Sequence, residues 1–228
     1  MRTLIYVPVI HTSADLGSLA KDVTKRGIAD LGEDAWEGHI RTVESFWDVI
    51  TDYFASIDAS GMKIYQDGMI AEGEAGAKIV EEGVRAGSKN HELIAKLVKG
   101  GAVLVRTEDF NLVKRELDRI LAVTGAKSVA QKLFAFLKYK CIKNRLLNKR
   151  DMFIAQRINE TLHDGEKGII FIGAFHDVKK WLPKDIQIKE IKDVCKVRAY
   201  QRLLPFYPKH KDKIDELCRY LMAKIDGD

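Results

Sequence analysis

The sequence predicts an α/β fold: a mainly parallel sheet of about five strands, flanked by helices on both faces. The main observation is that short apolar runs typical of buried strands alternate with longer segments of helical periodicity along all 228 residues. The chain is also long enough for one sizeable core, and its 46% hydrophobic content fits a globular protein. We therefore expect a single α/β domain over residues 1–228.

Five segments have the composition of β-strands. The segment 3–9 is rich in β-branched and aromatic residues, and Pro8 should lie at its end because proline cannot donate to a strand ladder. The segment 168–172 is almost wholly apolar, which predicts a central parallel strand covered on both faces. Apolar and polar residues alternate over 186–189, as in a half-exposed edge strand. The other two predicted strands are 62–66 and 102–106.

The helices are predicted from apolar residues that recur every three or four positions. The strongest pattern covers 36–57, whose aromatic content predicts deep burial. A helix that begins at Phe110 follows Thr107 and Asp109, and either of these residues could serve as its N-terminal cap. The remaining predicted helices are 75–85 and 91–98, each ending at glycine, then 127–147, 151–162 and a C-terminal helix over 211–225.

The densest basic stretch of the chain is 132–150. The net charge of +5 and the pI of about 8.9 indicate only a weak preference for anions, because acidic residues are nearly as abundant as basic ones. At helical spacing the lysines of this stretch lie on a solvated face, and the alternative is a patch for nucleic acid or an acidic partner. The opposite, core-facing stripe consists of Leu133, Phe136, Leu137, Ile142 and Leu146.

Cysteine usage and hydropathy predict a cytoplasmic protein that does not enter the membrane. Cys141, Cys195 and Cys218 show no metal-binding spacing, and their odd number argues against a disulfide framework, so we expect free buried thiols. The first apolar run is short and interrupted by Pro8, unlike a signal peptide. No later stretch approaches the ~20 apolar residues that span a bilayer.

Several common catalytic motifs are absent from the sequence. It contains no GxGxxG, no GxxxxGKS or GxxxxGKT, no GxSxG and no HExxH. Dinucleotide-dependent redox chemistry, P-loop phosphoryl transfer, serine-hydrolase elbows and helix-borne zinc protease chemistry are therefore disfavoured.

Polar side chains follow four of the predicted strands. His11 and His176 each come after an apolar run, Asp67 follows Gln66 at the end of the second strand, and Glu108 follows the third. Because the carboxyl ends of parallel strands border one crevice, we expect these side chains to lie close together. Imidazole carries protons near neutral pH and binds transition metals, and a neighbouring carboxylate fixes its tautomer or activates water.

Three further residues are candidates for holding a substrate. Arg150 and Asp151 should open the helix before the fourth strand, and Asp177 directly follows His176. A guanidinium group binds a carboxylate or phosphate with two hydrogen bonds. The structural alternative is an exposed helix-start pair for Arg150-Asp151 and a turn for Asp67-Gly68.

The C-terminal half resembles the TraB/Tiki proteins, which are related to the erythromycin esterase-like and ChaN-like proteins. The resemblance lies in the stretch RDMFIA at 150–155, followed by GIIFIGAFH at 168–176, whose last four residues match a GxxH signature. The family's first GxxH motif corresponds here to PVIH, with Pro8 in place of glycine, and Gln66-Asp67 stands where the family usually has a glutamate. The resemblance implies an α/β fold with both histidines facing one pocket. It also implies several functions, since the superfamily includes proposed metal-dependent proteases, esterases and haem-binding proteins.

We therefore expect a TraB-like hydrolase that acts on an anionic small molecule or peptide. Its catalytic residues would be His11, His176, Asp67 and Glu108, with the two histidines binding a divalent metal or acting as a base on water. The alternative is a non-catalytic protein that binds an anion or haem through the same histidines. Nucleic-acid binding through 132–150 is the weaker alternative.

Overall fold

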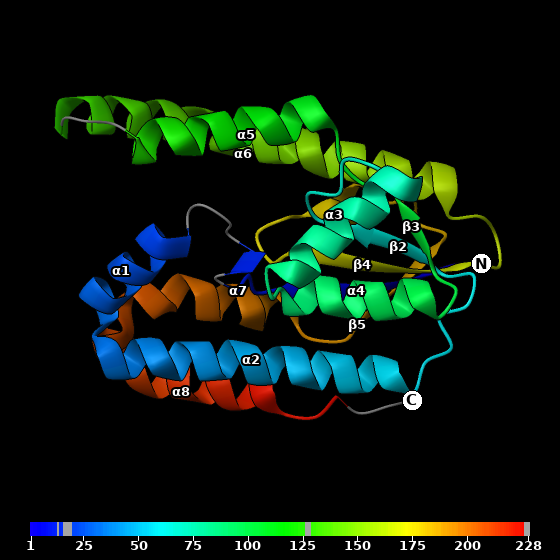
Figure 1. The fold of residues 1–228 in the computed structure, drawn as a ribbon, viewed down its shortest axis with the longest axis horizontal. Coiled ribbons are helices and arrows are strands. Elements are labelled where there is room, and N and C mark those ends of the chain that lie inside the picture. The colour runs from blue at the N-terminus through cyan, green and yellow to red at the C-terminus, as the bar shows by residue number, and fades with distance from the viewer. Residues whose placement is uncertain (13, 16–19, 126–128, 226–228) are drawn as a thin grey trace.

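The five strands form one parallel sheet. The computed structural model describes residues 1–12, 14–15, 20–125 and 129–225, but not the side chains of 124, 129–130, 132–137 and 140–141. The strand order is β3-β2-β4-β1-β5, and every neighbouring pair is parallel, which confirms the predicted fold class (Figure 1). The strands are β1 (Arg2–Val9), β2 (Lys63–Gln66), β3 (Val103–Val105), β4 (Lys167–Gly173) and β5 (Ile186–Glu190).

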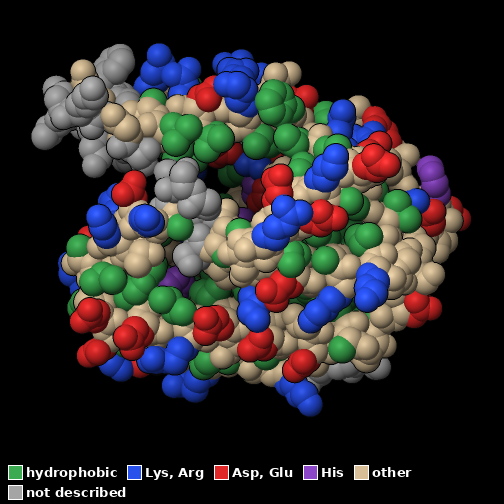
Figure 2. Space-filling model, in the orientation of Figure 1, with side chains coloured by type: hydrophobic (Ala, Val, Ile, Leu, Met, Phe, Trp, Pro, Cys, Tyr) green, Lys and Arg blue, Asp and Glu red, His purple; other side chains and the backbone are tan. Residues whose placement is uncertain are grey.

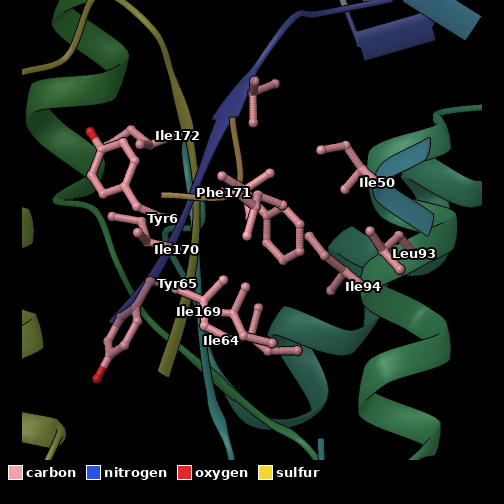
Figure 3. Packing of buried hydrophobic residues seen from close by; sticks show 14 of the residues in the cluster. Tyr6, Ile50, Ile64, Tyr65, Leu93, Ile94, Ile169, Ile170, Phe171 and Ile172 are labelled. Carbon is pink, nitrogen blue, oxygen red and sulfur yellow. The ribbon is translucent and has the colours of Figure 1, made fainter. Parts of the chain in front are cut away.

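Helices connect the strands and cover the sheet on both faces. In Figure 3, Ile64 and Phe171 point toward the side where α2 and α4 lie, whereas Ile170 and Ile172 point to the opposite side. This alternation follows from the pleat of the strand, and β4 is buried on both faces as its apolar sequence predicts. The helices are α1 (Ala20–Leu31), α2 (Glu33–Ala55), α3 (Gly73–Arg85), α4 (Lys89–Lys99), α5 (Phe110–Thr124), α6 (Val129–Thr161), α7 (Val194–Leu203) and α8 (Tyr207–Met222), with short 3-10 turns η2 (Val178–Trp181) and η3 (Leu204–Phe206).

The prediction of two helices over 127–147 and 151–162 is wrong, because α6 runs without interruption from Val129 to Thr161. Neither glycine nor proline occurs in this range, so nothing in the backbone chemistry stops the helix. Arg150 and Asp151 therefore lie inside a long helix and do not open one. Together with α5, the N-terminal part of α6 forms an arm that extends past the carboxyl ends of the strands (Figure 1).

Two helices were not predicted. None of the described residues of α1 is buried, so this helix lacks the apolar stripe that makes a helix visible in a sequence. The helix α7 is short and basic, and its N-cap is Asp193, whose carboxylate accepts hydrogen bonds from the backbone N–H groups of Cys195 and Lys196.

Other local predictions agree with the structure. Asp109 caps α5 by accepting a hydrogen bond from the backbone N–H of Leu112 at 3.0 Å. Pro8 is the second-last residue of β1, and β5 lies at an edge of the sheet. The basic residues Lys138, Lys143, Arg145 and Lys149 of α6 are exposed, and Leu146 is buried. The side chains of Leu133, Phe136 and Leu137 lie outside the described residues.

The cysteine prediction holds only in part. Cys195 and Cys218 are free thiols, but Cys195 is exposed because it lies in the first turn of α7, and Cys218 is half-buried. The side chain of Cys141 lies outside the described residues. Across the described part of the chain, no helix combines the length and the apolar character needed to cross a membrane.

Candidate functional site

The carboxyl ends of four strands bring the predicted site residues to one edge of the sheet. His11 follows β1, Asp67 follows β2, Glu108 follows β3 and His176 follows β4. The register places Gly173, the last residue of β4, beside Val9 of β1, with Phe171 beside Gln66 of β2. Because β4 lies between β2 and β1, the loops after these three strands meet at this edge, the usual ligand position in open parallel sheets.

Arg150 is the centre of a buried ionic network. Its guanidinium donates to Asp67 Oδ1 at 2.7 Å, to Glu116 Oε2 at 2.5 Å and to both carboxylate oxygens of Glu108. Burial raises the pKa of Glu108, and the hydrogen bonds from Arg150 oppose this shift. Burial works against the charge of Arg150 as well, but the carboxylates of Glu108 and Asp67 outweigh it and raise the Arg150 pKa. These hydrogen bonds fix the floor of the crevice.

His176 lies between two carboxylates. Its Nδ1 is 2.6 Å from Asp151 Oδ1, and its Nε2 is 3.5 Å from Asp67 Oδ2. Asp151 is buried in α6 and also accepts a hydrogen bond from the backbone N–H of Asp177 at 2.9 Å. Burial disfavours the protonated ring of His176, but Asp67 and Asp151 outweigh this effect and raise its pKa above the ordinary value. The two carboxylates therefore stabilise the positively charged imidazolium.

Asp67 joins the two halves of this network. Its Oδ1 accepts from Arg150, and its Oδ2 accepts from the backbone N–H of Gly173 at 3.1 Å. Burial alone would favour the neutral acid, but the charges of His176 and Arg150 hold the pKa of Asp67 well below its usual range. Asp67 is thus an ionised carboxylate between two cations.

Gly173 explains why the two predicted histidines share one site. A Cβ on this residue would lie 3.8 Å from His11 Nε2, 3.7 Å from His176 Cδ2 and 3.1 Å from Asp67 Oδ2. The two imidazoles therefore lie on either side of the same point, each within 3.8 Å of it. This agrees with the prediction from the strand ends that the two histidines lie close together. The glycine of the second GxxH motif leaves this point open.

His11 differs from His176 in its exposure. Its side chain is 42% exposed, and its Nδ1 is 4.0 Å from Asp15 Oδ2. Asp15 is almost fully buried and holds the loop after β1 by accepting from the Thr12 N–H, the Thr12 hydroxyl and the Ser88 hydroxyl. The Ser88 hydroxyl is also 2.8 Å from His91 Nδ1 at the start of α4. This cluster anchors the His11 loop to α4.

Sequence reasoning missed three residues of the site. Glu116 and Asp15 carry no recognisable motif, although Asp15 lies four positions after His11. Arg198 of the unpredicted α7 donates to the backbone carbonyls of Ala174 at 2.7 Å and His176 at 3.3 Å, which fixes the turn that carries His176. Only the folded chain brings these residues to the site.

Asp177, by contrast, points away from the network. Its side chain is 54% exposed, and its Oδ2 is 3.6 Å from Lys180. Its contact with the site is made by the backbone N–H, which donates to Asp151.

The residues of the crevice do not form a metal-binding set. Among the described residues, no group of three or more His, Cys, Asp or Glu side chains is arranged to hold a metal ion. Both oxygens of Asp67 already accept hydrogen bonds, and His176 Nδ1 is bonded to Asp151. A metal bound to Asp67 would share its oxygens with the hydrogen bonds from Arg150 and Gly173.

The crevice opens to solvent beneath the arm. Figure 2 shows a hollow between the arm and the body of the molecule, with acidic, basic and histidine side chains at its floor. A cavity of about 190 Å³ lies between the His11 loop, α1 and α2, and it is lined by His11, Trp36 and His39 among others. Burial lowers the pKa of His39 to about 4, so this histidine is neutral.

Comparison of the chain with protein-family models, with curated proteins and with solved structures found no match in any of the three.

Proposed function

We propose that the protein is a hydrolase that uses His11 and His176 for proton transfer to and from water. The observation that carries this proposal is the placement of His176 between Asp151 and Asp67, at 2.6 and 3.5 Å, with His11 facing the same open point beside Gly173. A histidine held between carboxylates next to a second, solvent-accessible histidine is a combination suited to acid–base chemistry.

In this proposal the two histidines have opposite roles. His11 is exposed to solvent, so its Nε2 accepts the proton of the attacking water. The carboxylates of Asp67 and Asp151 stabilise the protonated ring of His176, and in this proposal its Nε2 supplies a proton to the leaving group. The bond between the substrate's acyl or phosphoryl centre and its leaving group breaks as the water oxygen adds. One proton enters at His11 and one leaves from His176, so the protons balance.

The other predicted residues are assigned positioning roles. Asp151 fixes the tautomer and orientation of His176, and Arg150 keeps Asp67 ionised beside it. Glu108 is fully buried against Arg150, so it acts through Arg150 and does not touch substrate. Arg150 already makes four hydrogen bonds to protein carboxylates, so the anion-binding role predicted for it passes to other residues.

The test is a screen of chromogenic carboxylic esters, phosphoesters and short peptides with four proteins: wild type, His11→Gln, His176→Asn and His163→Gln. His163 is an exposed histidine at the opposite end of the sheet, so its replacement is the matched control. We expect turnover to fall by about 10²–10⁴-fold in the first two variants and to stay unchanged in the control. The melting temperature should stay similar in His11→Gln and His163→Gln. Full turnover in His176→Asn would refute the proposal.

The same four proteins also distinguish the hydrolase from the alternative, a non-catalytic ligand-binding protein. Saturable thermal stabilisation of the wild type by a ligand that is never turned over favours a binding protein. The near-complete burial of His176, which is 5% exposed, is the observation that favours this alternative.

A further inference from the structure

Phe175 lies exposed at the rim of the crevice. It precedes His176 directly, and its side chain is 42% exposed although it is large and apolar. The turn that presents it is closed by a hydrogen bond from the His176 N–H to the Gly173 carbonyl at 3.0 Å, and Arg198 holds the carbonyls on either side of Phe175. The ring is therefore held at the surface by a fixed turn, beside the proposed catalytic residues.

Two cations from distant parts of the chain reach this ring. Lys143 of α6 has its Nζ 5.9 Å from the ring centroid, and Arg202 of α7 has its Cζ 5.7 Å from it. Both distances are within the range of cation–π attraction. The Lys143 ammonium is also 5.9 Å from the ring of Tyr139, one turn earlier on α6.

Neither cation is neutralised by a carboxylate of the described residues. Within the described part of the chain, no carboxylate lies within ion-pair distance of Lys143 or Arg202, whereas Arg150, two turns further along α6, contacts three carboxylates. Two positive charges beside one ring repel each other, and that repulsion is relieved when an anion lies between them. The arrangement is complementary to a negatively charged group on a flat apolar body, which can stack on Phe175.

We propose that Lys143, Phe175 and Arg202, together the cationic rim, bind an organic anion whose carboxylate or phosphate lies between the two cations. The identification of this anion as the substrate rests on the proposed hydrolase function, but the binding itself does not. The site lies next to His176 in sequence, so an anion held there places the rest of the molecule toward the crevice.

The experiment is isothermal titration calorimetry with phenyl phosphate, benzoate and neutral benzyl alcohol. The double variant Lys143→Gln/Arg202→Gln removes both cations, and Arg145→Gln/Lys149→Gln is its control, because it removes the same charge from exposed positions of α6 away from the ring. We expect at least one anion to bind the wild type and its Kd to rise about tenfold or more in the first variant, but less than twofold in the control. Phe175→Leu should also weaken binding, and benzyl alcohol should not bind.

The two anions distinguish a phosphate from a carboxylate ligand, and binding of either supports the site. Binding of neither anion to the wild type overturns the proposal. Equal weakening in both double variants also overturns it, in favour of diffuse attraction to a basic surface such as that for nucleic acid. If the anion binds but the screen finds no turnover, the cationic rim stands and the hydrolase proposal fails. An unchanged Kd in Lys143→Gln/Arg202→Gln also overturns the proposal, because the two cations then do not contribute to binding.

Discussion

The floor and the rim of the crevice both carry cationic and histidine side chains, but the two regions differ in burial and in charge pairing. On the floor, Asp67, Glu108, Arg150, Asp151 and His176 are mostly or fully buried, and each charge meets an opposite charge. On the rim, His11 and the two cations beside Phe175 are exposed, and the cations have no protein carboxylate as partner within the described residues. This difference indicates that the paired charges of the floor stabilise the structure of the site, whereas the cations of the rim, unpaired among the described residues, are available to bind a ligand.

The largest expected effect follows removal of the central cation of the floor. Arg150→Met leaves the carboxylates of Asp67, Glu108 and Glu116 buried without their partner. Because breaking a buried ion network leaves uncompensated charge, we expect a loss of about 3–5 kcal/mol of unfolding free energy, measured by urea denaturation. Arg145→Met on the exposed face of α6 is the control and should change stability by less than about 0.5 kcal/mol. Similar losses of unfolding free energy in Arg150→Met and Arg145→Met would show that the buried network stabilises the protein no more than an exposed charge does.

A smaller effect is expected at the glycine between the two histidines. In Gly173→Ala the new methyl group would lie 3.1 Å from Asp67 Oδ2 and close to both imidazoles. Since the carboxylate is held by Arg150 and cannot move freely, we expect a loss of about 1–3 kcal/mol and a marked fall in any turnover. Gly165→Ala tests backbone strain alone, because Gly165 has a φ of +80° and an added Cβ would meet no atom within 4 Å. Unchanged stability and turnover in Gly173→Ala would show that the open point is unimportant.

The pH dependence of stability tests the charge on His176. Its pKa is raised in the folded state above the ordinary 6.5, so its stabilising contribution is complete below about pH 6.5 and is lost as the pH rises through the folded-state value. The stability difference between wild type and His176→Asn should therefore shrink as the pH rises from about 5.5 to about 9. Urea denaturation of both proteins across this pH range measures the difference in unfolding free energy. A difference that grows with pH would mean that the buried ring is neutral.

The smallest effect on stability is expected at the rim. His11→Gln removes a half-exposed ring whose nearest carboxylate is 4.0 Å away, so we expect a change of less than about 0.5 kcal/mol in thermal or urea unfolding. Asp15→Asn, which weakens the buried anchor of the same loop, should cost more, about 1–3 kcal/mol. If His11→Gln lowers the unfolding free energy more than Asp15→Asn does, His11 is a structural residue like those of the floor.

Much of the fold was predictable because local chemistry determines it. The apolar run of β4, the aromatic periodicity of α2 and the cap at Asp109 each act over a few residues. The helix α1 was missed because none of its described residues is buried. The uninterrupted course of α6 was missed because the Arg150-Asp151 pair was interpreted as a helix start, and no proline or glycine marks a boundary there.

The sequence by itself determined which residues end the strands, and therefore that His11, Asp67, Glu108 and His176 lie at one edge of a parallel sheet. That much follows from strand direction alone. Only the tertiary structure decided their roles, because charge pairing and exposure depend on groups far apart in the chain. Arg150 lies 83 residues from Asp67 and 42 from Glu108, and Lys143 and Arg202 each reach the ring of Phe175 from a different helix. No local pattern encodes these contacts, since they form only when α6 and α7 pack against the edge of the sheet.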